Sequence, residues 1–417
     1  MPANRAWRLR AAGLPWPALA IALAACGGAP DAADAPPVVA IDPLPSPAGP
    51  HSGEPNLAVD ASGRVHMTWH ERTSDSAHAL QYAILEGAEW TAPHTVIERG
   101  DFFVNWADFP SVLAAPDGRV IVHWLQRSGS GRYQYDVRIA QSNDGGATWS
   151  APVVLNRDGV SAEHGFVSLF PSGSDSVDAV WLDGRDTADR GPDRAMQLAT
   201  TRIGPDGGFG AERMLDTRIC DCCQTSAALT SRGAVVVYRD RSADEVRDIA
   251  VVRHVGGAWT EPAIVHADGW QIAACPVNGP AIAARGDTVA VVWFTGARDT
   301  ARVRVAFSTD AGATFGPPVR ADDGQPAGRV DIELDDDGRA IVSWLERTGG
   351  ERAEVRLRAV ARSGGLSPSV RVAASSSGRP SGFPRMVRRG SELVLAWTEP
   401  GDTARVRVAA ARLRRDE

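Results

Sequence analysis

Four of the five cysteines fall in two short segments, where their thiols could act together. They are Cys220, Cys222, Cys223 and Cys275. An even set of thiols in an oxidising compartment forms disulfides, and we predict a bond from Cys275 to Cys222 or Cys223. One alternative is a copper or zinc site, completed by His51 or His164, since thiolate and imidazole suit these metals. The other alternative is a redox-active thiol pair.

Nine polar or aromatic residues stand in short loops that each precede an apolar run, and they form the second candidate site. Loops on a rigid scaffold often carry binding residues. If these loops converge on one face, their carboxylate, imidazole, guanidinium, amide and indole groups would surround a polar ligand. The simpler alternative is that they only solvate the rim. The candidates are His51, Glu54, Trp106, Asp108, Glu163, His164, Asn278, Arg329 and Asp331.

The runs next to these loops are strands of a repeated unit. Seven apolar, β-branched runs each end in an aromatic residue, followed by a polar turn. The aromatics are Trp69, Trp124, Trp181, Tyr238, Trp293, Trp344 and Trp397. Successive aromatics are 51 to 57 residues apart, and a period of this length indicates a propeller or a solenoid. Each unit holds four short strands, which is the composition of a propeller blade.

The first and last units predict how the ring closes. The seventh unit ends near residue 413 without a fourth strand, and residues 36–42 match the missing strand. Borrowing a strand from the N-terminal end removes two exposed sheet edges. We therefore predict an all-β, seven-bladed propeller over residues 36–413, with six blades as the alternative.

The N-terminal residues indicate export. Three arginines precede an apolar stretch that ends in small residues before Cys26, a pattern that resembles a bacterial lipoprotein signal. We expect residues 1–26 to be the signal with a lipidated Cys26, and residues 27–35 to be a flexible tether. Gly27 in place of Asp favours the outer membrane or cell surface, although the inner membrane stays open.

Two turns share a Ser-x-Asp-x-Gly-x-Thr-aromatic motif. Their defining residues are Ser142, Asp144, Gly146 and Trp149 in one copy, and Ser308, Asp310, Gly312 and Phe315 in the other. The motif resembles the Asp box, or BNR repeat, of the sialidase superfamily, and the resemblance extends over the chain after residue 36. It implies a β-propeller in which these turns are structural clasps far from the active site.

The catalytic residues of sialidases are not matched. The family holds the substrate carboxylate with three arginines and uses a Tyr–Glu nucleophile pair with an Asp acid/base. Glu54 stands where the resemblance implies the first arginine, and no tyrosine precedes a late innermost strand. We therefore leave the catalytic residues unassigned and expect no turnover of a sialoside.

The charge balance narrows the functional classes. Net charge is −7 and no segment is strongly basic, which argues against nucleic acid as a partner. We expect a monomeric, membrane-anchored scaffold that binds a glycan, a protein or a metal through the loops of one face. The alternatives are an exo-glycosidase with a diverged site and a periplasmic copper- or zinc-handling protein.

Overall fold

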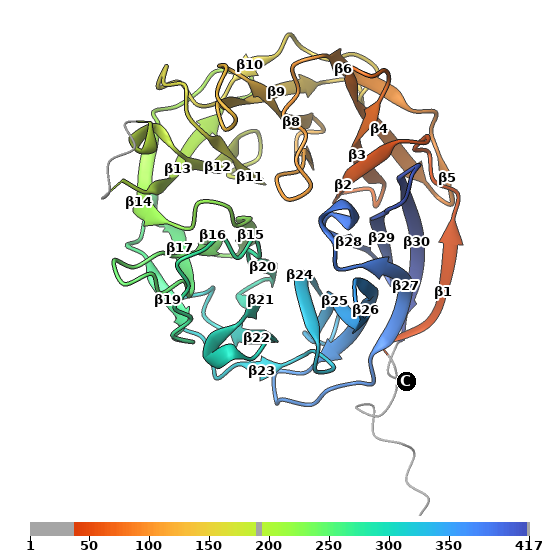
Figure 1. The fold of residues 1–417 in the computed structure, drawn as a ribbon, viewed down its shortest axis with the longest axis vertical. Coiled ribbons are helices and arrows are strands. Elements are labelled where there is room, and N and C mark those ends of the chain that lie inside the picture. The colour runs from red at the N-terminus through yellow and green to blue at the C-terminus, as the bar shows by residue number, and fades with distance from the viewer. Residues whose placement is uncertain (1–36, 189–193, 415–417) are drawn as a thin grey trace, which may run out of the picture.

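The chain forms a ring of seven four-stranded antiparallel blades, as Figure 1 shows. The computed structural model describes residues 37–188 and 194–414. The predicted signal, Cys26 and the tether therefore lie outside the described residues. Within the described ranges, no helix has the length and apolar character needed to cross a membrane. The seven-bladed prediction is confirmed, and the six-bladed alternative is wrong.

In blades one to six the strands run in sequence order from the inner edge outward. Blades one to three contain β2 (Ser52–Val59), β3 (Val65–Arg72), β4 (His78–Glu86) and β6 (His94–Arg99); β7 (Ser111–Ala114), β8 (Val120–Arg127), β9 (Tyr135–Ser142) and β10 (Val153–Val154); and β11 (His164–Pro171), β12 (Val177–Asp183), β13 (Met196–Ile203) and β14 (Arg213–Ile219). Blades four and five contain β15 (Ser226–Thr230), β16 (Gly233–Arg239), β17 (Ile249–Val255) and β19 (Ala263–His266); and β20 (Ala281–Arg285), β21 (Thr288–Thr295), β22 (Arg302–Ser308) and β23 (Val319–Arg320).

The last two blades complete the ring. Blade six contains β24 (Pro326–Leu334), β25 (Ala340–Gly349), β26 (Arg352–Val360) and β27 (Val370–Ser376). Blade seven contains β28 (Arg385–Arg389), β29 (Glu392–Glu399), β30 (Arg405–Leu413) and, on its outer edge, β1 (Val38–Leu44). Short additional pieces are β5 (Glu89–Trp90), β18 (Ala258–Trp259) and the 3₁₀ turns η2 (Arg185–Thr187), η3 (Ala297–Asp299) and η4 (Arg379–Ser381).

Ring closure follows the predicted route. β1 pairs antiparallel with β30, from Val38 opposite Leu413 to Leu44 opposite Val408. The last blade thus takes its fourth strand from the N-terminal end of the chain (Figure 1). β1 covers the outer edge of β30, which would otherwise be the exposed edge of the last blade.

The aromatic at the end of each second strand packs between blades. Trp69, Trp124, Trp181 and Trp344 are fully buried. Three of these indoles donate to a carboxylate two residues further along the strand, Trp69 to Glu71 at 3.2 Å, Trp181 to Asp183 at 2.8 Å and Trp344 to Glu346 at 2.6 Å. In these three blades the repeat therefore supplies apolar core surface and a partner for the buried indole N–H at once.

The alternation of strand direction sorts the loops between two faces of the ring. Loops that enter the first strand and loops that join the second to the third strand lie on one face, here called the entry face. The two Asp-box turns join third to fourth strands, β9 to β10 and β22 to β23, so they lie on the opposite face. Candidate binding loops and Asp boxes are thus on opposite faces of the molecule.

Candidate functional site

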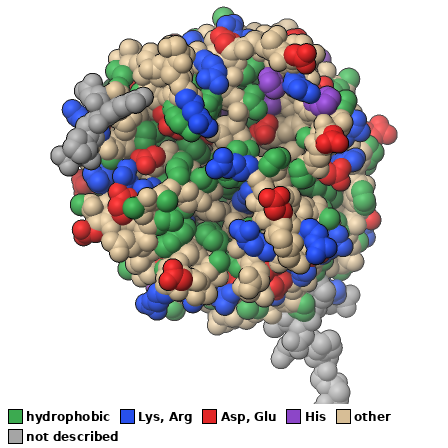
Figure 2. All heavy atoms as spheres, viewed as in Figure 1, with side chains coloured by type: hydrophobic (Ala, Val, Ile, Leu, Met, Phe, Trp, Pro, Cys, Tyr) green, Lys and Arg blue, Asp and Glu red, His purple; other side chains and the backbone are tan. Residues whose placement is uncertain are grey.

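The entry face holds a cavity of about 540 Å³ between blades two, three, four, five and seven. In the view along the ring axis, Figure 2 shows hydrophobic side chains near the ring centre with basic side chains beside them. The cavity is lined by Phe103, Val104, Asn105, Trp106, Ala107, Arg127, Arg132, Tyr133, Glu163, Phe166, Asp221, Cys222, Cys275, Val277 and Arg379.

One side of the cavity is a loop of blade two that reaches across the ring. Trp106 stacks on Phe383 with 5.9 Å between ring centroids, and the guanidinium of Arg329 lies 4.8 Å from the Trp106 ring centroid. The Gln224 amide donates to the Ala107 carbonyl oxygen at 2.6 Å. Contacts from blades four, six and seven therefore fix this loop, so the wall of the cavity is rigid.

A repeated β-bulge shapes the start of three innermost strands. Glu54, Phe166 and Arg329 have positive φ angles of 52°, 54° and 54°. In blades one, three and six, the strand register shifts around these residues. A non-glycine residue in this region carries about 1–3 kcal/mol of strain, which the surrounding structure must hold. Bulges of this kind redirect side chains and are common next to active sites.

Two carboxyl groups and a phenol meet at the base of the cavity. The Tyr135 hydroxyl donates to Glu163 Oε1 at 2.8 Å and lies 3.4 Å from Asp108 Oδ2. Burial raises the pKa of Glu163 to about 7, and burial also raises the pKa of Asp108 well above its usual range. Glu163 therefore holds or releases a proton near neutral pH.

Only one member of this group reaches the cavity. Glu163 lines it, whereas Tyr135 is fully buried and stacks on Phe103 with 3.9 Å between ring centroids. Asp108 is buried and accepts the Phe166 backbone N–H at 2.7 Å. Glu163 is therefore the member of this group that a ligand in the cavity can contact, and burial raises its pKa while the Tyr135 hydrogen bond lowers it.

Three arginines surround the mouth of the cavity. Arg127, Arg132 and Arg379 are exposed. Among residues 37–188 and 194–414, none places a carboxylate within ion-pair distance of these guanidinium groups. The first two lie over aromatic rings, Arg127 over Phe103 at 5.4 Å and Arg132 over Tyr133 at 5.2 Å. The mouth is therefore positively charged, although the chain as a whole carries a net charge of −7.

Two disulfides brace the far wall. Cys222 bonds Cys275, joining the loops of blades four and five, and Cys220 bonds Cys223 within one loop. The predicted bond from Cys275 is confirmed. The copper or zinc alternative at these residues is not supported, because bonded sulfurs are no longer thiolate ligands.

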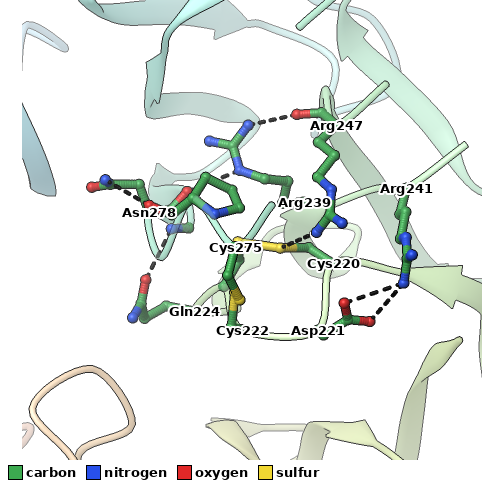
Figure 3. Close-up of a disulfide and its surroundings, with 12 residues drawn as sticks. Cys220, Asp221, Cys222, Gln224, Arg239, Arg241, Arg247, Cys275 and Asn278 are labelled. Carbon is green, nitrogen blue, oxygen red and sulfur yellow. Dashed lines mark hydrogen bonds and ion pairs between the residues drawn. A yellow bond between two sulfur atoms is a disulfide. The ribbon is translucent and has the colours of Figure 1, made fainter. Parts of the chain in front are cut away.

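Buried polar contacts hold the two cysteine loops in place (Figure 3). The fully buried Arg239 donates to the backbone oxygens of Asn278, Arg247 and Phe294 at 2.6–2.9 Å. Burial lowers the pKa of Arg239 to about 9, which still leaves the guanidinium charged at neutral pH. The Asn278 side chain accepts the Arg329 backbone N–H at 2.7 Å. Asn278 is therefore a support of the loop rather than a free ligand group.

The nine loop candidates separate into three groups. Trp106 and Glu163 line the 540 Å³ cavity. His51 and Glu54 line a neighbouring cavity of about 260 Å³. The remaining five point into internal contacts. They are Asp108, His164, Asn278, Arg329 and Asp331.

His164 shows why a polar residue in the right loop need not face the ligand space. Its Nε2 lies 3.0 Å from Asp158 and 3.7 Å from Asp183. Arg185 binds the same two carboxylates, at 3.2 Å and 2.6 Å. A guanidinium already occupies this acidic group, so its residues form an internal ion-pair network.

Sequence reasoning missed the three mouth arginines and Tyr133. Arg127 ends β8, and Arg132 and Tyr133 belong to the connection from β8 to β9, which lies on the entry face. The Gly- and Ser-rich run around residues 128–131 is the local signal that could have identified this loop as a long, exposed one.

No family model matches the chain, and no curated protein matches it. Solved structures share the fold at low identity. A lectin from Burkholderia pseudomallei, BP39L, has a TM-score of 0.58 and 13% identity, covering 86% of this chain and 96% of its own. A protein of unknown function from Dyadobacter fermentans has a TM-score of 0.52 and 12% identity, with coverages of 90% and 99%. The Hadza microbial sialidase Hz136 has a TM-score of 0.43 and 16% identity, with coverages of 70% and 63%. These likenesses concern the fold alone.

Proposed function

We propose that the 540 Å³ cavity binds an acidic saccharide. The observation that carries this proposal is the set of three arginines without carboxylate partners, Arg127, Arg132 and Arg379, around one mouth. A planar guanidinium binds a carboxylate through two parallel hydrogen bonds, which gives strength and orientation together. The rings of Tyr133 and Trp106 add apolar faces of the kind against which sugar rings pack.

The acidic residues of the cavity do not oppose an anionic ligand. Asp221 is paired with Arg241 at 3.1 Å. Glu163 has a pKa of about 7, so a large share of it is neutral at physiological pH and can donate a hydrogen bond. The local charge therefore remains positive, and the protonated carboxyl offers a donor to a ligand hydroxyl or carboxylate oxygen.

The test is saccharide binding by full-length protein and by the double variant Arg132→Ala/Arg379→Ala. Calorimetry with oligosaccharides ending in glucuronic acid or sialic acid should show at least a tenfold weaker Kd for the variant, since each charge-assisted hydrogen bond is worth about 1.5–3 kcal/mol. Both side chains are exposed, so the melting temperature should not change. The matched control is Arg362→Ala, an exposed arginine in a turn of the opposite face. Equal affinity in all three proteins would refute the proposal.

A second candidate function is glycoside hydrolysis, favoured by the contact between Tyr135 and Glu163. A carboxyl with a pKa near 7 suits a general acid, because it is protonated yet able to release its proton. With this second function the protein would be a diverged member of the sialidase superfamily, and the Asp-box turns support that relationship. Its test is a panel of fluorogenic acidic glycosides. Turnover lost in Glu163→Gln but kept in Arg362→Ala would establish it, and absence of turnover would leave the binding function.

We also propose that the propeller acts outside the cytoplasm, held by a lipid on Cys26. The supporting observations are the N-terminal signal pattern and two disulfides in the folded domain. Detergent partitioning of the wild type and of Cys26→Ala tests it. The wild type should enter the detergent phase and the variant should not. Equal partitioning would contradict the anchor.

A further inference from the structure

A second cavity adjoins the first on the entry face, at the junction of blades seven and one. It has a volume of about 260 Å³. Val104 lines both cavities, and η4 borders both, with Arg379 in one and Pro380 in the other. A chain of two or more ligand units could therefore occupy both spaces, passing over Val104.

The second cavity contains a carboxyl group held in a strained position. Glu54 lies in the β-bulge of blade one with φ 52°, and its backbone N–H donates to Thr398 Oγ1 at 3.2 Å. The Glu54 side chain is only 15% exposed. The imidazole of His70 lies beside the carboxyl, with 3.8 Å between Glu54 Oε2 and His70 Nδ1. That distance is too long for a hydrogen bond, so the carboxyl presents its hydrogen-bonding capacity to the cavity.

The imidazole beside it is also without partners. His70 is 3% exposed, lines the cavity, and has no hydrogen-bond partner at either ring nitrogen among the described residues. A buried polar atom without a partner costs about 1–3 kcal/mol. The edge of the Phe102 ring packs against the imidazole, with 5.3 Å between centroids, and fixes its orientation. The unpartnered imidazole and the partly exposed Glu54 carboxyl thus face one space, which is the arrangement expected of a site completed by its ligand.

We propose that this second cavity is a binding subsite for a neutral, hydroxyl-bearing sugar unit, recognised by Glu54 and His70. The inference rests on the proposed function in taking the ligand to be a saccharide. It adds that the ligand has a neutral unit next to its acidic one. The carboxylic acid donates to a hydroxyl oxygen, and the imidazole accepts from or donates to a second hydroxyl.

Charge selects a neutral occupant. Burial raises the pKa of Glu54 to about 7, and burial lowers the pKa of His70 to about 3. Between about pH 3 and pH 7 both groups are therefore mostly uncharged. The guanidinium of Arg72 would repel a cationic ligand, and the Glu54 carboxylate would repel an anionic ligand once that group has lost its proton. The titratable and charged groups around this space are His51, His70, Arg72, His78, Asp402 and, behind His70, His123.

The test uses neutral probes, the methyl glycosides of glucose, galactose, mannose and N-acetylglucosamine, with full-length protein. Ligand-observed NMR should detect at least one of them, with an affinity at least about tenfold lower at pH 8.5 than at pH 5.5, since binding needs the protonated Glu54. Glu54→Gln should retain the affinity and lose that pH dependence, because an amide keeps a neutral donor. His70→Phe should weaken the probe at least fivefold at an unchanged melting temperature.

Three outcomes would overturn the inference: no probe binds, His70→Phe binds as the wild type does, or the pH dependence persists in Glu54→Gln. The last outcome would assign the dependence to the histidines around the cavity. Arg132→Ala/Arg379→Ala should not affect the neutral probes. If that variant loses acidic-saccharide binding while no neutral probe binds the wild type, the proposed function stands and only this subsite is refuted.

Discussion

The two faces of the ring satisfy their polar groups in opposite ways. On the Asp-box face, Asp310 accepts from the Ser308 hydroxyl at 2.6 Å and from the Thr314 N–H and hydroxyl at 2.9 and 2.6 Å. Asp144 repeats the same contacts at 2.7, 2.9 and 2.6 Å. On the entry face, the contacts at the cavity join residues of different blades, and His70 has no hydrogen-bond partner among the described residues.

The difference lies in sequence separation. Asp-box contacts join residues no more than four positions apart. Entry-face contacts join residues 28 positions apart for Tyr135 and Glu163, and 117 for Ala107 and Gln224. A turn whose side-chain hydrogen bonds are all local can recur wherever its motif occurs. A face built from several blades is unique to this ring, and it is where strain and unpaired charge concentrate.

The largest expected effect tests whether the entry face depends on inter-blade contacts. Arg329 is buried and donates to the backbone oxygens of Ser377, Gly378 and Gly382 at 2.9–3.0 Å, and also to the Ser381 hydroxyl. Arg329→Ala leaves these acceptors without a donor, so we expect the free energy of unfolding in chemical denaturation to fall by about 3 kcal/mol or more.

Arg329→Met is the matched variant for that prediction. It keeps an apolar stem against Trp106 and removes only the donors. Both variants should also weaken acidic-saccharide binding, because Arg329 anchors η4, which carries Arg379. A Met variant as stable as the wild type would show that packing on Trp106, rather than the hydrogen bonds, holds η4.

An intermediate effect is expected on the other face. Asp310→Ala removes three hydrogen bonds that are local to one turn, so the free energy of unfolding should fall by about 1–2 kcal/mol. Saccharide affinity should stay at the wild-type value, since the turn lies on the face opposite the cavities. Asp144→Ala is the parallel variant in the other turn. A change in affinity in either variant would break the separation of the two faces.

The fold was predictable because each repeat carries local signals. The aromatic strands, the Asp boxes and the unmatched N-terminal strand at residues 36–42 give blade number and closure; the strand itself lies at Val38–Leu44. Equivalent loops of adjacent blades must be neighbours, which predicts Cys275 beside Cys222 or Cys223, and the bond is to Cys222.

The site was only partly predictable. Loop position identified Glu163 and Trp106, but not whether a side chain faces the cavity or an internal partner. Arg329 shows this limit, because its bulge turns the guanidinium toward η4, more than 40 residues away in sequence. Nor did the Tyr135–Glu163 contact have a sequence signal, since Tyr135 begins the third strand of one blade and Glu163 precedes the first strand of the next.

The smallest expected effect is a difference between the two faces in how their contributions to stability depend on pH. Burial holds the pKa of Glu163 at about 7 in the folded protein, above its value of about 4.5 when exposed. The folded state therefore binds more protons than the unfolded state between these values, and the stability contributed by protonated Glu163 is lost as pH rises through 7. We expect a loss of about 1 kcal/mol between pH 6 and pH 8, and a flatter profile in Glu163→Gln.

Asp310 behaves in the opposite sense, because its turn hydrogen bonds hold its pKa below the usual range, so its contribution to stability is lost as pH falls below about 4. Chemical denaturation of the wild type, Glu163→Gln and Asp310→Ala across pH 3–9 measures how the free energy of unfolding depends on pH in each. If the free energy of unfolding of Glu163→Gln still falls as steeply above pH 6, the loss belongs to other buried carboxyls such as Glu54 and Glu333.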